Sequence, residues 1–185
     1  MRDADAALVA RLRAGEEAAC REFVDAYRDR ILSVVSRILG SSEQAEDLAQ
    51  ETFLKAFRAI DRFEGQSALF TWLYRIAVNT ARDELSTRRR RPTHSIEGAD
   101  GPLVEPEDTG DGPAERLVRE ERIRAVRAAL ERLPEPFRTT LILRDMEGNS
   151  YEQVAEILGI SIGTVESRIF RARCKLRVLL GGQSP

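Results

Sequence analysis

A stretch of 23 residues, 92–114, divides the chain more sharply than any other feature. It holds four of the seven prolines, four of the twelve glycines, six acidic side chains and no basic one, and its apolar residues show no period. Proline and glycine interrupt both helices and strands, and like charges repel, so this composition is typical of a flexible linker. We therefore expect two small domains, residues 1–91 and residues 115–185, joined by this linker.

Charge and composition limit what the two domains can be. Residues 1–91 carry a net charge of +1, the linker −6 and residues 115–185 +3. Two cysteines and one histidine are too few for a disulfide framework, a four-ligand zinc site or most His-based catalysis. No apolar run approaches the roughly 18 residues that span a bilayer, and the acidic N-terminus lacks the apolar block of a secretory signal. We expect a cytoplasmic protein with no membrane insertion, no metal and no cofactor.

Apolar residues recur at spacings of three and four almost throughout, which predicts an all-α fold of two small helical domains. Gly40 should end the first long helix, and Ser41 or Ser42 should cap the next one. The basic run Arg88–Arg91 should close the last helix of the first domain, because Pro92 follows it. The helices expected before residue 150 lie at about 23–38, 48–60, 67–91, 117–130 and 133–146.

The stretch from Ser150 to Leu180 predicts a helix-turn-helix. Ser150 and Gln153 have the spacing of a capping box, which marks the start of a helix. Gly159 can supply the left-handed turn that ends this helix. A second, basic helix should begin near Gly163 and Thr164. Such a pair of helices is typical of DNA-binding proteins.

A helical wheel orients the second helix of this motif. Four apolar residues step by four, three and four from Val165 to Leu176, so they should face the core. The opposite face offers an arginine for guanine, hydroxyls and an aromatic ring for bases, and flanking arginines for phosphates. The candidate DNA-binding residues are Thr164, Ser167, Arg168, Phe170, Arg171 and Arg173. The alternatives are a solvated basic surface and, for Phe170, a packing contact with earlier helices. Cys174 also points outward, where an inert thiol is expected.

Five segments then form a series along the chain: Glu46–Phe53, Phe70–Asn79, Leu133–Arg138, Ser150–Ala155 and Gly163–Arg173. In this order they resemble a bacterial sigma-70 initiation factor of the two-domain extracytoplasmic-function (ECF) group. They cover nearly all of the chain outside the linker and the termini. The resemblance implies a non-enzymatic factor that binds core RNA polymerase and promoter DNA and directs promoter-specific initiation. It also implies an anti-sigma protein as inhibitor.

The resemblance gives the first domain two roles. The acidic helix within residues 43–64 resembles the surface that docks on the polymerase clamp, with candidate residues Asp47, Gln50, Glu51 and Phe53. The helix over 67–91 and the loop before it resemble the part that recognises and opens the −10 element, where aromatic platforms and an amide can receive unstacked bases. The candidates here are Phe63, Ser67, Trp72, Arg75, Asn79 and Arg82. The alternatives are a core position for Trp72 and a structural hydrogen bond for Asn79.

The resemblance also implies that the second domain reads the −35 element and that helix 133–146 touches the polymerase flap. One residue departs from the pattern, because position 166 is Glu where a basic or variable residue is expected. This puts promoter choice and phosphate contacts in doubt. The acidic linker would either mimic RNA near the polymerase's RNA channel or act as a passive tether.

Two other functions fit parts of the sequence. An ordinary helix-turn-helix regulator whose first helices sense a ligand or dimerise would explain the second domain but leave Trp72–Asn79 unexplained. Binding to core polymerase would separate these two hypotheses. A carboxylate metal enzyme is the third, built on Glu43, Glu46, Asp47 and Glu51. The histidines that helical di-metal sites add and a Gly-rich phosphate loop are both missing from the sequence.

Overall fold

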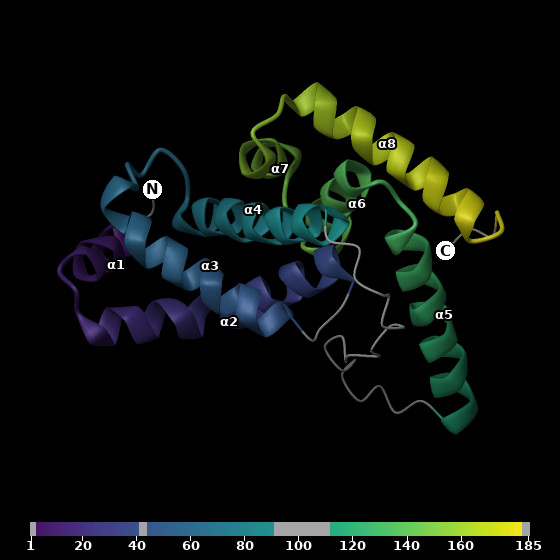
Figure 1. Ribbon diagram of the computed structural model, residues 1–185, viewed down its shortest axis with the longest axis horizontal. Helices are drawn as coiled ribbons and strands as arrows, with labels where there is room; N and C mark the ends of the chain where they lie inside the picture. Colours follow the sequence, from purple (N-terminus) through teal and green to yellow (C-terminus); the bar gives the residue numbers. More distant parts are fainter. Residues whose placement is uncertain (1–2, 41–43, 91–111, 183–185) are drawn as a thin grey trace. The chain divides into compact units, whose positions relative to one another are not determined.

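The computed structural model describes residues 3–40, 44–90 and 112–182, apart from the side chains of residues 3, 4, 89, 113 and 114 (Figure 1). All regular structure in these ranges is helical, which confirms the all-α prediction. The chain divides into two compact units, Met1–Gly101 with Glu156–Gly159 and Pro102–Ala155 with Ile160–Pro185. Most of the expected linker, residues 92–111, lies outside the described ranges.

Three long helices that pack pairwise against one another form the first unit (Figure 1). Phe23 lies fully buried among them, and its ring meets those of Phe53 and Phe57 edge-on, at centroid distances of 5.8 and 5.9 Å. This arrangement sets the positive edge of one ring against the negative face of another. The aromatic contacts thereby join the first two of the three helices. These helices are α2 (Glu17–Leu39), α3 (Ala45–Ala59) and α4 (Leu69–Arg90).

The ends of α2 and α3 follow the sequence prediction only in part. Gly40 ends α2 with a φ of 76°, and its N–H donates to the Ser36 carbonyl at 2.9 Å. Glycine adopts this left-handed conformation without the penalty a Cβ would bring. Gln44 precedes α3 and makes no side-chain cap hydrogen bond. Ser41 and Ser42, the predicted caps, lie outside the described residues.

The apolar spacing did not predict the first helix, α1 (Asp3–Arg13). Its Val9 and Leu12 are buried, with exposed fractions of 4% and 5%. Arg13 at its end donates from Nε to the carbonyl of Ile60 at 3.3 Å and from Nη2 to the carbonyl of Phe63. These carbonyls belong to the 3-10 turn η1 (Ile60–Arg62) and to the residue after it. The N-terminal helix therefore holds the turn that leads toward α4.

The second unit is built around α6 and α8, which pack closely together. Its core contains Leu130, Leu133, Leu141 and Ala172, all buried, with Phe137 among the half-buried residues packed against them. The elements of this unit are α5 (Pro113–Glu131), α6 (Glu135–Leu141), the π-helical turn η2 (Ile142–Met146), the first part of α7 (Tyr151–Leu158) and α8 (Ile162–Leu179). The last residues of α7, from Glu156 on, group with the first unit. The helix expected over 133–146 is thus a short α-helix that continues into a π turn.

The start of α5 lies two residues before the expected second domain. Pro113 takes the first helical position, where its missing N–H costs nothing. Glu115 accepts a hydrogen bond from the Gly112 N–H at 3.2 Å, which satisfies a free donor at the helix start. Along α5 the packing is uneven, because Leu117 is 60% exposed whereas Leu130 is buried.

Candidate nucleic-acid and polymerase interfaces

The capping box predicted at the start of α7 is formed. The Ser150 N–H donates to Gln153 Oε1 at 2.8 Å, and the Gln153 N–H donates to Ser150 Oγ at 3.2 Å. A hydrogen bond from the Ser150 side chain also holds the pKa of Glu152 below its usual value. Two donors that the first turn would otherwise leave free are therefore satisfied.

The turn after α7 sets the start of α8. Gly159 has a φ of 64°, and the Ile160 N–H donates to the Ala155 carbonyl at 3.0 Å. Ser161 caps α8 by accepting the Thr164 N–H at 3.2 Å. The second helix of the motif consequently begins at Ile162, close to the expected position.

The two faces of α8 are those that the wheel predicts. Val165, Ile169 and Ala172 are buried, with exposed fractions of at most 2%. Phe170, next to Ile169 in sequence, is 70% exposed, and Arg171 is exposed beside it. The alternative that Phe170 is a packing residue does not hold in this structure. A large aromatic ring in water next to a guanidinium is an arrangement suited to contact with a base pair.

The hydroxyl groups on this face are partly engaged within the helix. Ser161 Oγ lies 2.8 Å from Thr164 Oγ1, and Thr164 is half-buried. Ser167 is exposed, and its Oγ donates to the Thr164 carbonyl at 3.0 Å. A hydroxyl that donates within the helix still has lone pairs to accept a hydrogen bond from outside. Cys174 is a free, exposed cysteine on the same face.

The two flanking arginines have different surroundings. Arg168 is half-buried. Arg173 is held by Asp145 of the η2 turn in a bidentate ion pair, with Nη2–Oδ1 2.7 Å and Nε–Oδ2 3.0 Å. The hydrogen bond to Asp145 raises the pKa of Arg173 above its usual value. Arg173, expected to meet a phosphate, already has an anionic partner within its own unit.

The candidate −10 residues of α4 share one face of the helix. Trp72, Arg75, Asn79 and Arg82 follow one another at steps of three, four and three residues, which keeps them in a single row. Arg75 and Asn79 are exposed, whereas Trp72 and Arg82 are half-buried. Trp72 is therefore no plain core residue. Its ring packs on that of Phe63 at a centroid distance of 5.1 Å, tilted by 49°.

Phe63 and Ser67, the candidates from the loop before α4, are less accessible. Phe63 is only 4% exposed and Ser67 is half-buried. The Phe63 ring supports Trp72 and has no open face for a base. In the basic run at the end of α4, Arg88 bonds to Glu84 at 3.0 Å and to Gln44. Arg91 lies outside the described residues.

Two of the four candidate polymerase-binding residues, Gln50 and Phe53, line a groove between α2 and α3. Asp47, Gln50 and Glu51 are exposed, whereas Phe53 is 5% exposed and belongs to the core. Glu51 also pairs with Lys55 at 2.9 Å. The groove has an apolar floor and polar rims, and is lined by Val24, Arg28, Leu32, Glu46, Ala49, Gln50 and Phe53.

Sequence reasoning missed both the α2 side of this groove and Leu54. Leu54 is 52% exposed and lies one helical turn from Gln50 and next to Phe53 in sequence. The signal was present, because Leu54 falls outside the buried row formed by Ala45, Ala49 and Ala56. A large apolar side chain in water beside an apolar groove indicates a surface for a protein partner.

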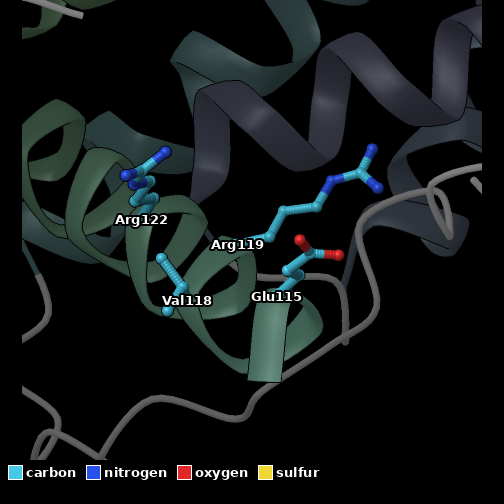
Figure 2. A pocket seen from close by; sticks show the side chains of 4 residues that line it. All are labelled: Glu115, Val118, Arg119 and Arg122. Atoms are coloured by element: carbon cyan, nitrogen blue, oxygen red, sulfur yellow. The ribbon is translucent and has the colours of Figure 1, made fainter. Parts of the chain in front are cut away.

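A second hollow lies along α5 (Figure 2). Glu115, Val118, Arg119 and Arg122 line it, and Figure 2 shows that all four extend from consecutive turns of this one helix. Val118 is 48% exposed. No other described element contributes a lining residue, so the hollow does not bring together side chains from different elements as a ligand site would.

The described part of the chain contains neither a candidate metal site nor a helix suited to a membrane. Within residues 3–40, 44–90 and 112–182, no group of three or more His, Cys, Asp or Glu side chains is placed to hold a metal ion. Glu43, one of the four carboxylates considered for such a site, is outside these ranges. None of the described helices combines the length and the apolar character needed to cross a membrane.

Comparison with known proteins adds independent findings. The family description "Sigma-70 region 2" matches residues 23–91, and "Sigma-70, region 4" matches residues 123–176. The RNA polymerase sigma-H factor of Pseudomonas aeruginosa is 41% identical over 173 residues, 91% of this chain and 90% of that protein. The ECF RNA polymerase sigma-E factor of Escherichia coli is 41% identical over 177 residues, with 91% and 90% covered.

Two solved structures are similar over most of the chain. One is CnrH in complex with the cytosolic domain of CnrY, with a TM-score of 0.71, 31% identity, and 98% of this chain and 100% of that chain covered. The other is the sigma factor RpoE in complex with the anti-sigma factor NepR from Bartonella quintana. Its TM-score is 0.69, its identity 27%, and its coverage 89% of this chain and 98% of that chain.

Proposed function

Because this chain belongs to the extracytoplasmic-function group of sigma-70 factors, we propose that each of its domains reads one promoter element. The chain binds core RNA polymerase and promoter DNA and directs promoter-specific initiation of transcription. In our proposal, residues 1–91 bind the polymerase and recognise and melt the −10 element. Residues 115–185 read the −35 element, and residues 92–114 link the two.

The exposed face of α8 is the surface proposed to enter the major groove of the −35 element. The observation that carries this proposal is Phe170, 70% exposed beside Arg171. Arginine can donate two hydrogen bonds to guanine, and an aromatic ring can contact the methyl group of thymine. Ser167, Thr164 and Arg168 complete the set with hydroxyl groups and a charge for bases or phosphates.

The row on α4 is the surface proposed to hold the melted −10 strand. The Trp72 ring packs on that of Phe63 and, being half-buried, still offers a surface on which an unstacked base can lie. Asn79 is exposed in the same row and carries both a donor and an acceptor for a base edge. Arg75 and Arg82 supply positive charge for the sugar–phosphate backbone. Ser67 in the preceding loop is proposed to contact the strand as well.

The groove between α2 and α3 is proposed as the polymerase-binding surface. Its apolar floor and the exposed Leu54 offer area that becomes buried on contact, which is the main source of binding free energy. Gln50 lines the groove, and the exposed carboxylates of Asp47 and Glu51 lie next to it on α3, where negative charge favours a basic partner. Phe53 contributes by shaping the floor of the groove.

An anti-sigma protein is proposed as a further partner. One structurally similar protein, the sigma factor RpoE from Bartonella quintana, is in complex with the anti-sigma factor NepR. Another, CnrH, is in complex with the cytosolic domain of CnrY. The family acts through polymerase and DNA and is not enzymatic, so we propose no catalytic role for any residue. We also propose that the protein acts in the cytoplasm, where core polymerase and promoter DNA would meet it.

Run-off transcription with purified core polymerase tests the proposed function. Core polymerase alone and core polymerase with the chain would each be offered a library of promoters that vary at the −35 and −10 elements. The expected result is a defined set of start sites that appears only with the chain. Arg171→Ala should remove the preference at −35 while the chain still co-purifies with core polymerase. If the chain does not bind core polymerase, or leaves start sites unchanged, the function is wrong.

A further inference from the structure

The exposed face of α8 has two edges that differ in charge. One edge, which we call the basic edge, consists of Thr164, Arg168, Arg171 and Lys175. The other, which we call the mixed edge, consists of Glu166, Phe170, Arg173 and Arg177. Both sets follow steps of four, three and four residues, so each forms a straight row on the helix.

Ion pairing increases the difference between the edges. No hydrogen bond or ion pair from the Arg168, Arg171 or Lys175 side chain is found to any other described residue, so the basic edge keeps three positive charges. On the mixed edge, Asp145 holds Arg173 through two bonds of 2.7 and 3.0 Å. With Asp145 and Glu166 counted, the mixed edge has no net charge.

The π turn η2 is what brings Asp145 to this edge. Asp145 lies within Ile142–Met146 and is 28 residues from Arg173 in sequence. Neighbouring bonds fix this turn, because Asn149 is buried and its Nδ2 donates to the Leu143 carbonyl at 2.9 Å. The Asp145 carboxylate is therefore presented by a fixed backbone, and its two oxygens match the two nitrogens of Arg173.

From this we infer that Asp145 is a positioning residue for promoter binding, which keeps Arg173 away from DNA phosphate and leaves the basic edge as the phosphate-binding edge of α8. The inference rests on the proposed role of α8 at the −35 element. A phosphate would have to compete with a carboxylate that already makes both hydrogen bonds to Arg173. The DNA backbone is then contacted by Arg168 and Lys175, on either side of the base-reading Arg171, which fixes how the helix is tilted in the groove.

Salt dependence of promoter binding can separate the two edges. Each lysine or arginine that neutralises a DNA phosphate contributes about 0.9 to the slope of log affinity against log salt concentration. The measurement uses holoenzyme reconstituted from core polymerase and the full chain, bound to promoter DNA at several salt concentrations. The variants are Lys175→Gln, Arg173→Gln, Asp145→Asn and the double variant Asp145→Asn with Arg173→Gln.

The expected slopes differ among these variants. Lys175→Gln flattens the slope by about 0.9, so a fourfold rise in salt weakens binding about 3.5-fold less than for the unchanged protein. Arg173→Gln leaves the slope unchanged. Asp145→Asn releases Arg173 and steepens the slope by about 0.9. Because a phosphate contact does not depend on sequence, this variant also lowers the preference for the matched over a scrambled −35 element. Arg173→Gln in the Asp145→Asn background returns the slope to its starting value.

Two control variants distinguish an effect of charge on DNA binding from an effect on the folded structure. Asp145→Glu keeps the carboxylate and should behave as the unchanged protein. Glu166→Gln removes an acid from the same edge without touching Arg173, so its effect should add to that of Arg173→Gln without coupling. Amide hydrogen exchange of α8 shows whether each variant retains the helix.

Several results would overturn the inference. If Arg173→Gln alone flattens the slope as much as Lys175→Gln does, Arg173 binds phosphate in spite of Asp145. If Asp145→Asn is folded and leaves the slope unchanged, the ion pair is only structural. Should Asp145→Asn not fold, the comparison of Arg173→Gln with Lys175→Gln still decides. If the unchanged holoenzyme shows no promoter preference, the proposed function itself fails, which is a different outcome from either.

Discussion

Two adjacent residues of α8, Ile169 and Phe170, allow the roles of its two faces to be separated by single substitutions. Ile169 is 2% exposed and Phe170 is 70% exposed, although both are large and apolar. Truncation to alanine removes only apolar atoms in both cases, and the larger group is lost at Phe170. The structure predicts that Ile169→Ala damages folding and spares the DNA-reading surface, and that Phe170→Ala does the reverse.

The magnitudes follow from burial. Ile169→Ala leaves a cavity in the core of the second unit, for which about 2–5 kcal/mol of stability is lost. Phe170 has less than a third of its surface covered, so its truncation costs less than about 1 kcal/mol out of the roughly 1.5–3 kcal/mol of full burial. A lost base contact costs about 1–3 kcal/mol in specific binding, which is about 5-fold or more in affinity.

Hydrogen exchange and transcription together measure both effects. Exchange of the α8 amides reports local opening of this helix and does not require the whole chain to unfold in one step. Ile169→Ala should speed this exchange strongly, whereas Phe170→Ala should leave it nearly unchanged. Phe170→Ala should lower transcription from promoters that depend on their −35 element at least fivefold. Full −35-dependent transcription by folded Phe170→Ala would refute the reasoning that this ring reads DNA.

Three further predictions concern the other surfaces. Trp72→Ala should slow promoter melting, measured by the fluorescence of 2-aminopurine in the −10 element, while promoter binding through −35 persists; normal melting would exclude Trp72 as a base platform. Leu54→Ser should weaken binding to core polymerase by about tenfold without loss of helix content, because a half-exposed leucine contributes more to a partner than to the fold; unchanged co-purification would contradict this. Ser150→Ala should destabilise the start of α7 by about 1 kcal/mol, seen as faster exchange of its first-turn amides; unaltered exchange there would show that the capping box is dispensable.

Local patterns in the sequence were enough for some elements. The buried row of α8 and the outward position of Phe170 both follow from a period of 3.6 residues, because a helix places residues by angle alone. The capping box at Ser150 and Gln153 is equally local and is formed as predicted. Gly40 and Gly159 also end their helices as expected, because the positive φ that each adopts depends on the residue type at that position and not on distant contacts.

Other features depend on residues far apart in sequence, and no local pattern reveals them. Arg13 bonds to carbonyls 47 and 50 residues away, and Arg173 pairs with an acid 28 residues before it. Phe63 lies outside any helical period, so its burial beneath Trp72 could not be predicted. Phe53 is different, because its spacing from Ala49 and Ala56 places it next to the buried row of α3. Its core position was therefore open to prediction from the wheel.

The hydrogen bonds from Arg13 to the carbonyls of Ile60 and Phe63 connect the first helix to the segment that precedes α4. Removal of the first thirteen residues, by a protease or by design, would delete the hydrogen bonds from Arg13 that hold the segment before Trp72. We expect the groove between α2 and α3 to remain, because none of its lining residues is removed. We expect the shortened protein to be recruited to polymerase and yet to open DNA poorly. A single cut would therefore separate recruitment to polymerase from the opening of DNA, two activities that the uncut chain combines.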